Sequence, residues 1–395
     1  MRAALAILVL VGLIASAPPA HAQFTLRLWY SWYGDAELLL KQWITDYQTT
    51  TANIVIQAEF VPLYELRQRF ASTPNADRPD MFFAPSDWSG DLYANALTAP
   101  LDVKLNAAYR AQISELAWQT TRYNQKTLGV PVALDGLVLY YNSALVPADT
   151  VAKTWDDLLD QAGKTPDKIG LSMGVGFYPT AGWLFAYGGG LIDEQGHNQL
   201  TSESALTQYF TRVKNLYDRS GGAIQIGSAG TDFRVGNGLY AIDGTWQYWE
   251  NRAMLTPNFG VAPLPSIDGN PWRPLVRSTL LYISASSRQM DVALAFGRFI
   301  TNATTQTAMA KTGLFIPVNP NAVIEDKDIA TVAQFLQNGI PQPTRPELIK
   351  YYHAFQGQID EVAIRGKAPE EAARTMLDQF APETPTPKAT ATATK

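Results

Sequence analysis

Cysteine is absent from this 395-residue sequence. Without thiols the chain can form no disulfide, no thiolate metal site and no cysteine nucleophile. Histidine is also scarce, since the chain has only three, which leaves little material for a zinc site or a Ser-His-Asp triad. The composition therefore disfavours much of enzyme chemistry, and we predict no catalytic residues, no metal and no cofactor.

Excess positive charge is the second thing the chain lacks. Its 31 lysines and arginines are outnumbered by 36 aspartates and glutamates, which gives a formal net charge of -5. Such a chain has no positive field with which to neutralise phosphates, so we expect no nucleic-acid partner. Hydrophobic residues make up 46% and charged residues 17%, as in a folded globular protein, and the length indicates two domains.

The only long apolar run lies at the N-terminus. Arg2 precedes the apolar residues 3–17, and the Ala-His-Ala sequence at 20–22 has the small residues that a signal peptidase accepts. The run is shorter than the roughly 20 apolar residues that cross a bilayer. We therefore predict a signal peptide over residues 1–22, cleaved after Ala22, and a periplasmic or extracellular protein that is not embedded in a membrane.

Strand and helix patterns alternate at the start of the mature chain. Period-two alternation predicts strands at 24–30 and 54–60, a short apolar run predicts a strand at 80–84, and helical spacing follows at 36–47 and 63–70. This repetition predicts an α/β fold with a mostly parallel sheet. Asp35, Thr154 and Ser202 each have the side chain and the position of a helix cap. Residues 381–395, rich in Thr, Ala, Pro and Lys, are predicted to be a disordered tail.

Large rings and an acid follow two of these predicted strands. Trp32 and Tyr33 come after the first strand, and Asp87 and Trp88 come after the third. In sheets of this kind ligands collect at the carboxyl ends of the strands, so these residues are predicted to share one rim. A large ring in such a loop has no automatic core partner, which favours a ligand-facing role.

Five ordered stretches resemble the extracellular solute-binding proteins of sugar ABC importers, of the maltose-binding protein type. They are RYNQKTLGVPV at 122–132, LYYN at 139–142, TWDDL at 154–158, AIDGTWQYW at 241–249 and GKAPEEA at 366–372. With shorter similarities these stretches extend from Leu26 to about Met376, in the order of that family. Any one of them alone is weak, but the ordered set is specific.

The resemblance implies two α/β lobes joined by hinge crossovers, with a ligand cleft between them. By similarity the first lobe comprises 23–133 plus 280–330, and the second comprises 134–279 plus 331–380. The implied function is to bind a maltose-like or malto-oligosaccharide ligand outside the cytoplasm, and to deliver it by lobe closure to the permease subunits of an ABC importer. We expect a monomer. A sensory receptor in place of the permease is an alternative that the sequence leaves open.

Sugar binding needs carboxylates or amides for the hydroxyls at the sugar's rim and flat rings for its C-H faces. We predict Asp87 and Asp135 as the acceptors, although Asp135 could instead cap a turn before Gly136. The resemblance adds aromatic residues: Tyr178 and Trp183 in the second-lobe wall, Trp246 and Tyr248 as a stacking platform after a buried strand, and Tyr352 as a further ring. Trp249 has the opposite parity in a strand-like alternation with Trp246 and Tyr248, and is assigned to the core. The acidic and basic side chains that the family has in its first loop are replaced by Trp32 and Tyr33, which leaves the exact saccharide open.

Three other functions remain as alternatives. A polyol-phosphate ligand would depend on arginines in the cleft, for instance Arg234 or Arg277. A ferric ion would use neighbouring phenolates such as Tyr351 and Tyr352, although the surrounding tryptophans suit a sugar better. A secreted glycoside hydrolase would need paired carboxylates across the scissile bond, and 36 acidic residues provide many pairs.

Overall fold

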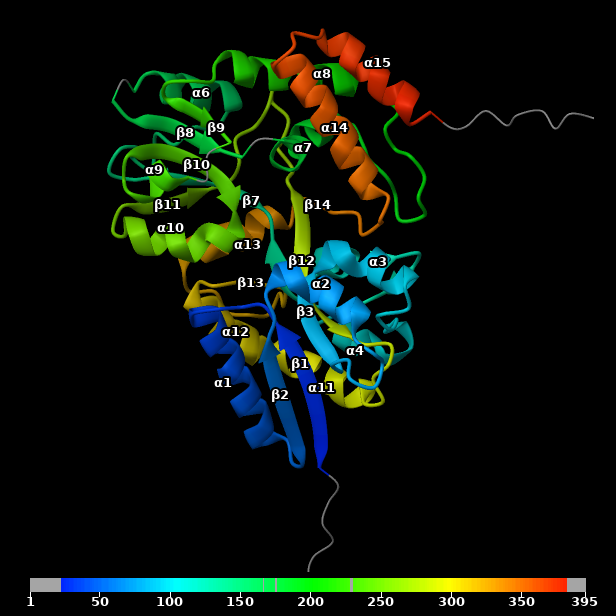
Figure 1. Cartoon of the computed structure of the whole chain (residues 1–395). Helices are drawn as coiled ribbons and strands as arrows, with labels where there is room; N and C mark the ends of the chain where they lie inside the picture. The colour runs from blue at the N-terminus through cyan, green and yellow to red at the C-terminus, as the bar shows by residue number, and fades with distance from the viewer. Residues whose placement is uncertain (1–22, 166, 175, 228–229, 382–395) are drawn as a thin grey trace, which may run out of the picture.

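The computed structural model describes residues 23–165, 167–174, 176–227 and 230–381. The predicted signal peptide, and the predicted tail apart from Ala381, lie outside these residues. The described chain forms two α/β lobes, one above the other in Figure 1, and each lobe is built on its own sheet. No helix among the described residues combines the length and the apolar composition that crossing a membrane requires.

The sheet of the first lobe has the strand order β13-β6-β12-β3-β1-β2, with β14 paired to β12. Its strands are β1 Phe24–Tyr30, β2 Ile54–Phe60, β3 Met81–Pro85, β6 Val130–Asp135, β12 Leu275–Ile283, β13 Ile316–Pro317 and β14 Ile340–Pro341. β1 is parallel to β2 and β3, whereas β12 is antiparallel to β3 and β6. The expected mostly parallel sheet is therefore wrong, because β12 returns from the second lobe and enters the sheet in the opposite direction.

The sheet of the second lobe has the order β11-β7-β10-β8-β9. Its strands are β7 Leu137–Asn142, β8 Ile169–Met173, β9 Ile224–Ile226, β10 Gly238–Gly244 and β11 Phe259–Ala262. β8, β9 and β10 run parallel, and β7 is antiparallel to β10 and β11. β7 follows β6 after the single residue Gly136, so one crossover between the lobes is a nearly continuous extended segment.

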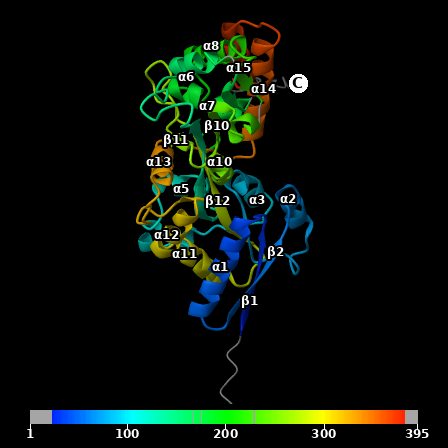
Figure 2. The same cartoon turned by 90° about the vertical axis from the view of Figure 1, so that its left-hand side faces the viewer.

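Helices cover both faces of each sheet. In the first lobe they are α1 Asp35–Thr50, α2 Leu63–Ser72, α3 Ser89–Ala94, α4 Ala107–Arg110, α5 Glu115–Gln119, α11 Met290–Ile300 and α12 Ala303–Thr312. The second lobe has α6 Trp155–Gly163, α7 Phe177–Ala186, α8 Glu203–Asp218, α9 Thr231–Arg234, α10 Tyr248–Leu255, α14 Leu348–Ala363 and α15 Pro369–Gln379. α13 Lys327–Leu336 lies at the level where the lobes meet (Figures 1 and 2).

Two of the three predicted helix caps are confirmed. Thr154 Oγ1 accepts a hydrogen bond of 3.2 Å from the backbone N–H of Asp157, and Ser202 Oγ accepts one of 3.1 Å from Ala205. Each satisfies an N–H group that the first turn of its helix leaves unpaired. Asp35 is not a cap, because Gly34 takes that position with a φ of 60° and Asp35 already lies in the first turn of α1.

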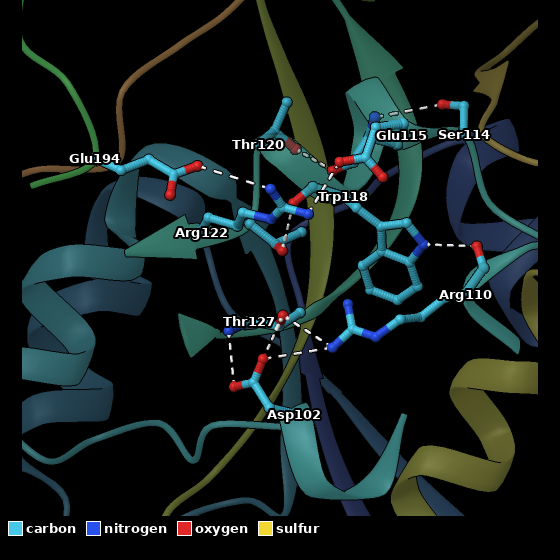
Figure 3. Close-up of polar contacts among 11 residues, drawn as sticks. Asp102, Arg110, Ser114, Glu115, Trp118, Thr120, Arg122, Thr127 and Glu194 are labelled. Carbon is cyan, nitrogen blue, oxygen red and sulfur yellow. Dashed lines mark hydrogen bonds and ion pairs between the residues drawn. The ribbon is translucent and has the colours of Figure 1, made fainter. Parts of the chain in front are cut away.

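The lobes also contact each other away from the cleft described below. Arg122 forms an ion pair of 2.9 Å with Glu115 of its own lobe and one of 4.0 Å with Glu194 of the second lobe (Figure 3). Arg345 Nη1 donates to Asn124 Oδ1 at 2.8 Å and to the backbone carbonyl of Glu194 at 2.9 Å. Arg122 and Asn124 belong to the turn formed by β4 Arg122–Tyr123 and β5 Lys126–Thr127. The lobe boundaries stay a prediction, and β12 lies across the predicted change at 279/280.

Candidate functional site

A cleft of about 680 Å³ lies where the two lobes meet. The first lobe lines it with the loop 31–36 after β1, the end of β3, the end of β6, part of β12 and the residues just before β13. The second lobe contributes the short 3-10 helix η3 Thr245–Gln247 and α10. The carboxyl ends of β1 and β3 thus lie at one rim, as their order in the sequence predicts, and together with the end of β6 they face one helical segment of the opposite lobe.

The first-lobe wall of the cleft is aromatic. The Trp32 ring stacks on Phe83, with centroids 4.4 Å apart and planes at 27°, and it lies 4.9 Å from the ring of Phe315. Tyr33 is 80% exposed, and both Trp32 and Tyr33 line the cleft. Because packing fixes one face of Trp32, the ring is a rigid wall that loses little entropy when a ligand binds.

The second-lobe wall corrects two predictions. Trp246 and Trp249 both line the cleft and are 43% and 41% exposed, whereas Tyr248 is only 1% exposed and packs in the core. The predicted assignments rested on strand-like alternation after β10, but the chain turns at once into η3 and α10. In a helix, residues three apart share a face, so Trp249 joins Trp246 and Tyr248 turns away. Tyr248 accepts a 3.2 Å hydrogen bond from Arg252 instead.

Five other predicted residues are also absent from the cleft lining: Asp87, Tyr178 and Tyr352, which are described below, and Trp88 and Trp183, which pack in the cores. Trp183 of α7 is fully buried and packs against Trp155 and Trp272, with centroid distances of 5.0 and 5.4 Å, in the second-lobe core. Trp88 packs on the small first-lobe core around Trp29, and the Arg67 guanidinium lies 5.7 Å from its ring centroid. The chain turns into the 3-10 helix η1 Ser86–Trp88 directly after β3, which carries Trp88 away from the rim.

Charged groups occupy the inner end of the cleft. Asp135, the last residue of β6, is paired with Arg277 of β12, and both line the cleft. The Asp135 carboxylate accepts hydrogen bonds from Thr279 Oγ1 at 3.3 Å and Thr245 Oγ1 at 3.4 Å. Burial raises the pKa of Asp135, although Arg277 and the two hydroxyls oppose the rise. Burial opposes the charge of Arg277, but nearby phenols and carboxylates outweigh it and raise its pKa.

Unpaired polar atoms surround this charged pair. Within the described residues, Asp87 Oδ1, Arg277 Nε and the hydroxyls of Tyr178 and Tyr352 are buried without a hydrogen-bond partner. All four residues interact electrostatically, and burial raises the pKa of Tyr178 to about 12. A buried polar atom left unpaired costs about 1–3 kcal/mol. Hydrogen-bonding capacity that the described residues leave unused is therefore gathered next to the charged pair.

The Asp135 carboxyl gives a prediction about pH. Its pKa in the folded protein is raised, so the wild type loses stability as pH rises from the unfolded value of about 3.9 through the folded value. We expect Asp135→Asn to raise the free energy of unfolding at neutral pH, with a gain that disappears in acid, where the native carboxyl is itself neutral. Urea unfolding at a series of pH values measures this. A loss of stability at neutral pH would mean that attraction to Arg277 outweighs burial.

Sequence reasoning missed Trp249 and Met254 of α10, and it considered Arg277 only as a phosphate ligand. A helical reading of residues 246–254 could have found Trp249, since the spacing of three from Trp246 is visible in the sequence. No local signal marks Arg277. Its place follows from the pairing of β12 with β6, which joins residues 142 positions apart in the chain and is set by tertiary structure.

The architecture defines a class: two-lobe binding proteins that enclose a small ligand between hinged α/β halves. The chain belongs to the bacterial extracellular solute-binding protein family, whose model matches residues 42–337. This membership agrees with the resemblance seen in the sequence. The two-lobe α/β fold that the resemblance implied is the fold that the structure has.

Relatives and solved structures agree with this assignment. The chain is 23% identical to a galactooligosaccharide-binding protein of Bacillus subtilis, over 78% of this chain and 76% of that protein. It is 24% identical to the maltodextrin-binding protein MdxE of the same organism, over 77% of each. A cyclo/maltodextrin-binding protein complexed with maltotetraose superposes with a TM-score of 0.80 at 22% identity, over 92% of this chain and 98% of that one. A Thermus thermophilus maltotriose-binding protein gives a TM-score of 0.74 at 21% identity, over 90% and 98%.

Proposed function

We propose that this protein binds a malto-oligosaccharide-like carbohydrate outside the cytoplasm and delivers it to the permease of an ABC importer by lobe closure. The observation that carries the proposal is a cleft whose two walls are aromatic and whose lining also includes the polar groups of Asp135, Arg277 and Thr279. A sugar ring has apolar C-H faces and a rim of hydroxyls, which matches that division. The maltodextrin-binding relatives support the same ligand class.

Each lobe supplies part of the proposed contact surface. Trp32 and Tyr33 come from the first lobe, and Trp246 and Trp249 come from the second. A ligand shifts a two-state equilibrium only through its different affinity for the two states. A sugar that touches both walls binds the closed arrangement better than the open one, so binding itself drives closure. The closed form is then what a permease would recognise, with the protein acting as a monomer that is exported and freed of residues 1–22.

Arg277 favours one second candidate, a polyol phosphate, because it places a guanidinium in the cleft. Against this candidate, Asp135 lies opposite Arg277 in the sheet and Asp87 raises the pKa of the guanidinium, so two carboxylates already offset its charge. A phosphate dianion would meet their repulsion. The site is better suited to neutral hydroxyl groups, from which the Asp135 carboxylate accepts hydrogen bonds while its charge is balanced by Arg277.

Calorimetric titration tests the proposal. We expect maltotriose and maltotetraose to bind with micromolar dissociation constants, since a few charge-assisted hydrogen bonds of about 1.5–3 kcal/mol each and ring stacking exceed the cost of ordering. Glycerol 3-phosphate should give no heat of binding. A galacto-oligosaccharide belongs in the same panel because of the galactooligosaccharide-binding relative. Binding of glycerol 3-phosphate without any binding of oligosaccharide would reverse the assignment.

Turnover must be tested on the same sample. The bound maltotriose is recovered after long incubation and its reducing ends are assayed, with a known amylase as the positive control. We expect no new reducing ends, because the proposed role of the cleft is to bind and not to cleave. Their appearance would make the protein a glycoside hydrolase, which needs two carboxyl groups placed across the bond that is cleaved.

A further inference from the structure

The indole of Trp246 lies directly against the backbone of Gly244. A Cβ atom added to Gly244 would sit 2.2 Å from Cε2 and Cζ2 of that ring, far inside van der Waals contact. Gly244 is the last residue of β10, and its φ of -79° is open to any residue. Glycine is therefore needed here for space and not for backbone conformation. The indole of Trp246 occupies the space that a side chain at position 244 would otherwise fill.

Arg277 contacts this ring from the other lobe. Its Cζ atom lies 4.8 Å from the ring centroid of Trp246 and 5.9 Å from that of Tyr178. The two rings are themselves 6.2 Å apart with planes at 38°. A guanidinium at this distance is attracted to the electron-rich ring, and the attraction grows when water is excluded. The Trp246 indole is thus held between the glycine backbone beneath it and a cation beside it.

The Arg277 side chain is a stable support for the ring. Arg277 lies on β12, which is paired on both sides, with β3 and with β6. Asp135 lies opposite it across the sheet, and both Asp135 and Asp87 favour its charged form. Its Nε atom has no hydrogen-bond partner among the described residues.

We propose that Arg277 is a positioning residue that holds the Trp246 indole over Gly244 and so fixes the face that the ligand meets. This inference rests on the proposed function, because it gives Trp246 a ligand to stack on. Trp246 is 43% exposed at the cleft and has the freedom to take other rotamers when unsupported. Holding the ring in advance removes that freedom before binding and improves affinity without a new ligand contact.

A double-mutant cycle separates positioning from direct contact, since Arg277 also lines the cleft. Maltotriose affinity is measured for the wild type, Arg277→Met, Trp246→Ala and the double variant. We expect Arg277→Met to weaken binding about tenfold in the wild-type background and less than about twofold once Trp246 is alanine. Additive effects would overturn the proposal, because Arg277 would then act on the ligand itself. Arg288→Met, which replaces an exposed arginine outside the cleft, is the control and should bind as the wild type does.

The ligand-free protein provides a readout that a ligand contact would not move. The ten tryptophans are labelled with 5-fluorotryptophan, and the Trp246 resonance is assigned by its absence in Trp246→Phe. We expect Arg277→Met to broaden or split that resonance, as the ring samples several rotamers, and Arg277→Lys to restore one line. Gly244→Ala should displace the ring and weaken maltotriose binding to a similar degree. A single unchanged line in Arg277→Met would contradict the positioning role.

The outcomes distinguish this inference from the function on which it rests. If Trp246→Ala leaves maltotriose affinity unchanged, Trp246 is not part of the binding site and the inference is overturned with it. If Trp246→Ala weakens binding while Arg277→Met is additive with it, only the positioning role is overturned and the sugar site stands. Calorimetry with the wild type tests the function independently of both variants.

Discussion

Trp246→Ala is expected to weaken maltotriose binding about 30-fold, which corresponds to about 2 kcal/mol. The indole is an exposed ring that the second lobe presents to the cleft, and alanine removes both its stacking face and its apolar area. The free energy of unfolding should change by less than about 0.5 kcal/mol, because the ring is 43% exposed and lies outside the core clusters. Calorimetric titration and urea unfolding of the same preparations measure the two quantities.

Two matched variants sharpen this experiment. Trp249→Ala removes the second tryptophan of the same wall and should weaken binding, since the helix turns both rings toward the cleft. Leu38→Ala removes a side chain that is 62% exposed on α1 and does not line the cleft, so affinity should be unchanged. If Trp246→Ala and the wild type bind maltotriose with equal affinity, the Trp246 ring is not part of the binding site.

The periodicity of the sequence predicted much of the fold. Alternation predicted β1 and β2, helical spacing predicted the buried face of α1 that contains Trp43 and Tyr47, and Thr154 and Ser202 correctly marked the first turns of two helices. These signals are local, because each depends on residues within one or two turns or strands. The direction of β12 is not local. It depends on where the chain returns from the second lobe, which no window of sequence contains.

The candidate site likewise contains residues that local sequence signals placed correctly and residues that they placed wrongly. Trp32 and Tyr33 were predicted from their place after a strand, and the structure brings them to the cleft. Trp88 also follows a strand but faces the core, because an immediate 3-10 turn redirects it. Tyr248 and Trp249 exchanged roles for a related reason, since the period changes from 2 to 3.6 at the end of β10. Strand position predicts the rim, whereas the first turn after the strand decides which side chain faces it.

The polar side chains of the cleft include a residue of the crossover between the lobes. Asp135 is followed by Gly136 and then by β7 of the second lobe, so this cleft-lining carboxylate belongs to a crossover segment. Its hydrogen-bond donors come from both sides, with Thr279 in the first sheet and Thr245 at the start of η3. A change of lobe angle alters these bonds together with the ligand's environment. The crossover segment and the proposed binding site therefore share Asp135.

Trp183→Ala is expected to lower the free energy of unfolding by about 4 kcal/mol, within the range of 3–5 kcal/mol that deletion of a buried tryptophan costs. The ring is fully buried between Trp155 and Trp272, and the neighbouring Gly182 already leaves no room, since a Cβ there would lie 2.2 Å from Trp272. Close packing of this kind cannot relax to fill the cavity that alanine leaves. Urea unfolding followed by circular dichroism measures the loss.

Trp183→Phe separates the structural role of this residue from a role in binding. Phenylalanine keeps much of the apolar volume and removes an indole N–H that is buried without a partner, so it should cost about 1–2 kcal/mol, clearly less than alanine. Maltotriose affinity of the folded Trp183→Phe protein should equal that of the wild type, because the residue supports the second lobe from within its core and does not line the cleft. A purely structural residue affects ligand binding only through the fraction of protein that is folded. A loss of affinity in Trp183→Phe with little loss of stability would therefore mean that Trp183 contributes to the binding site itself.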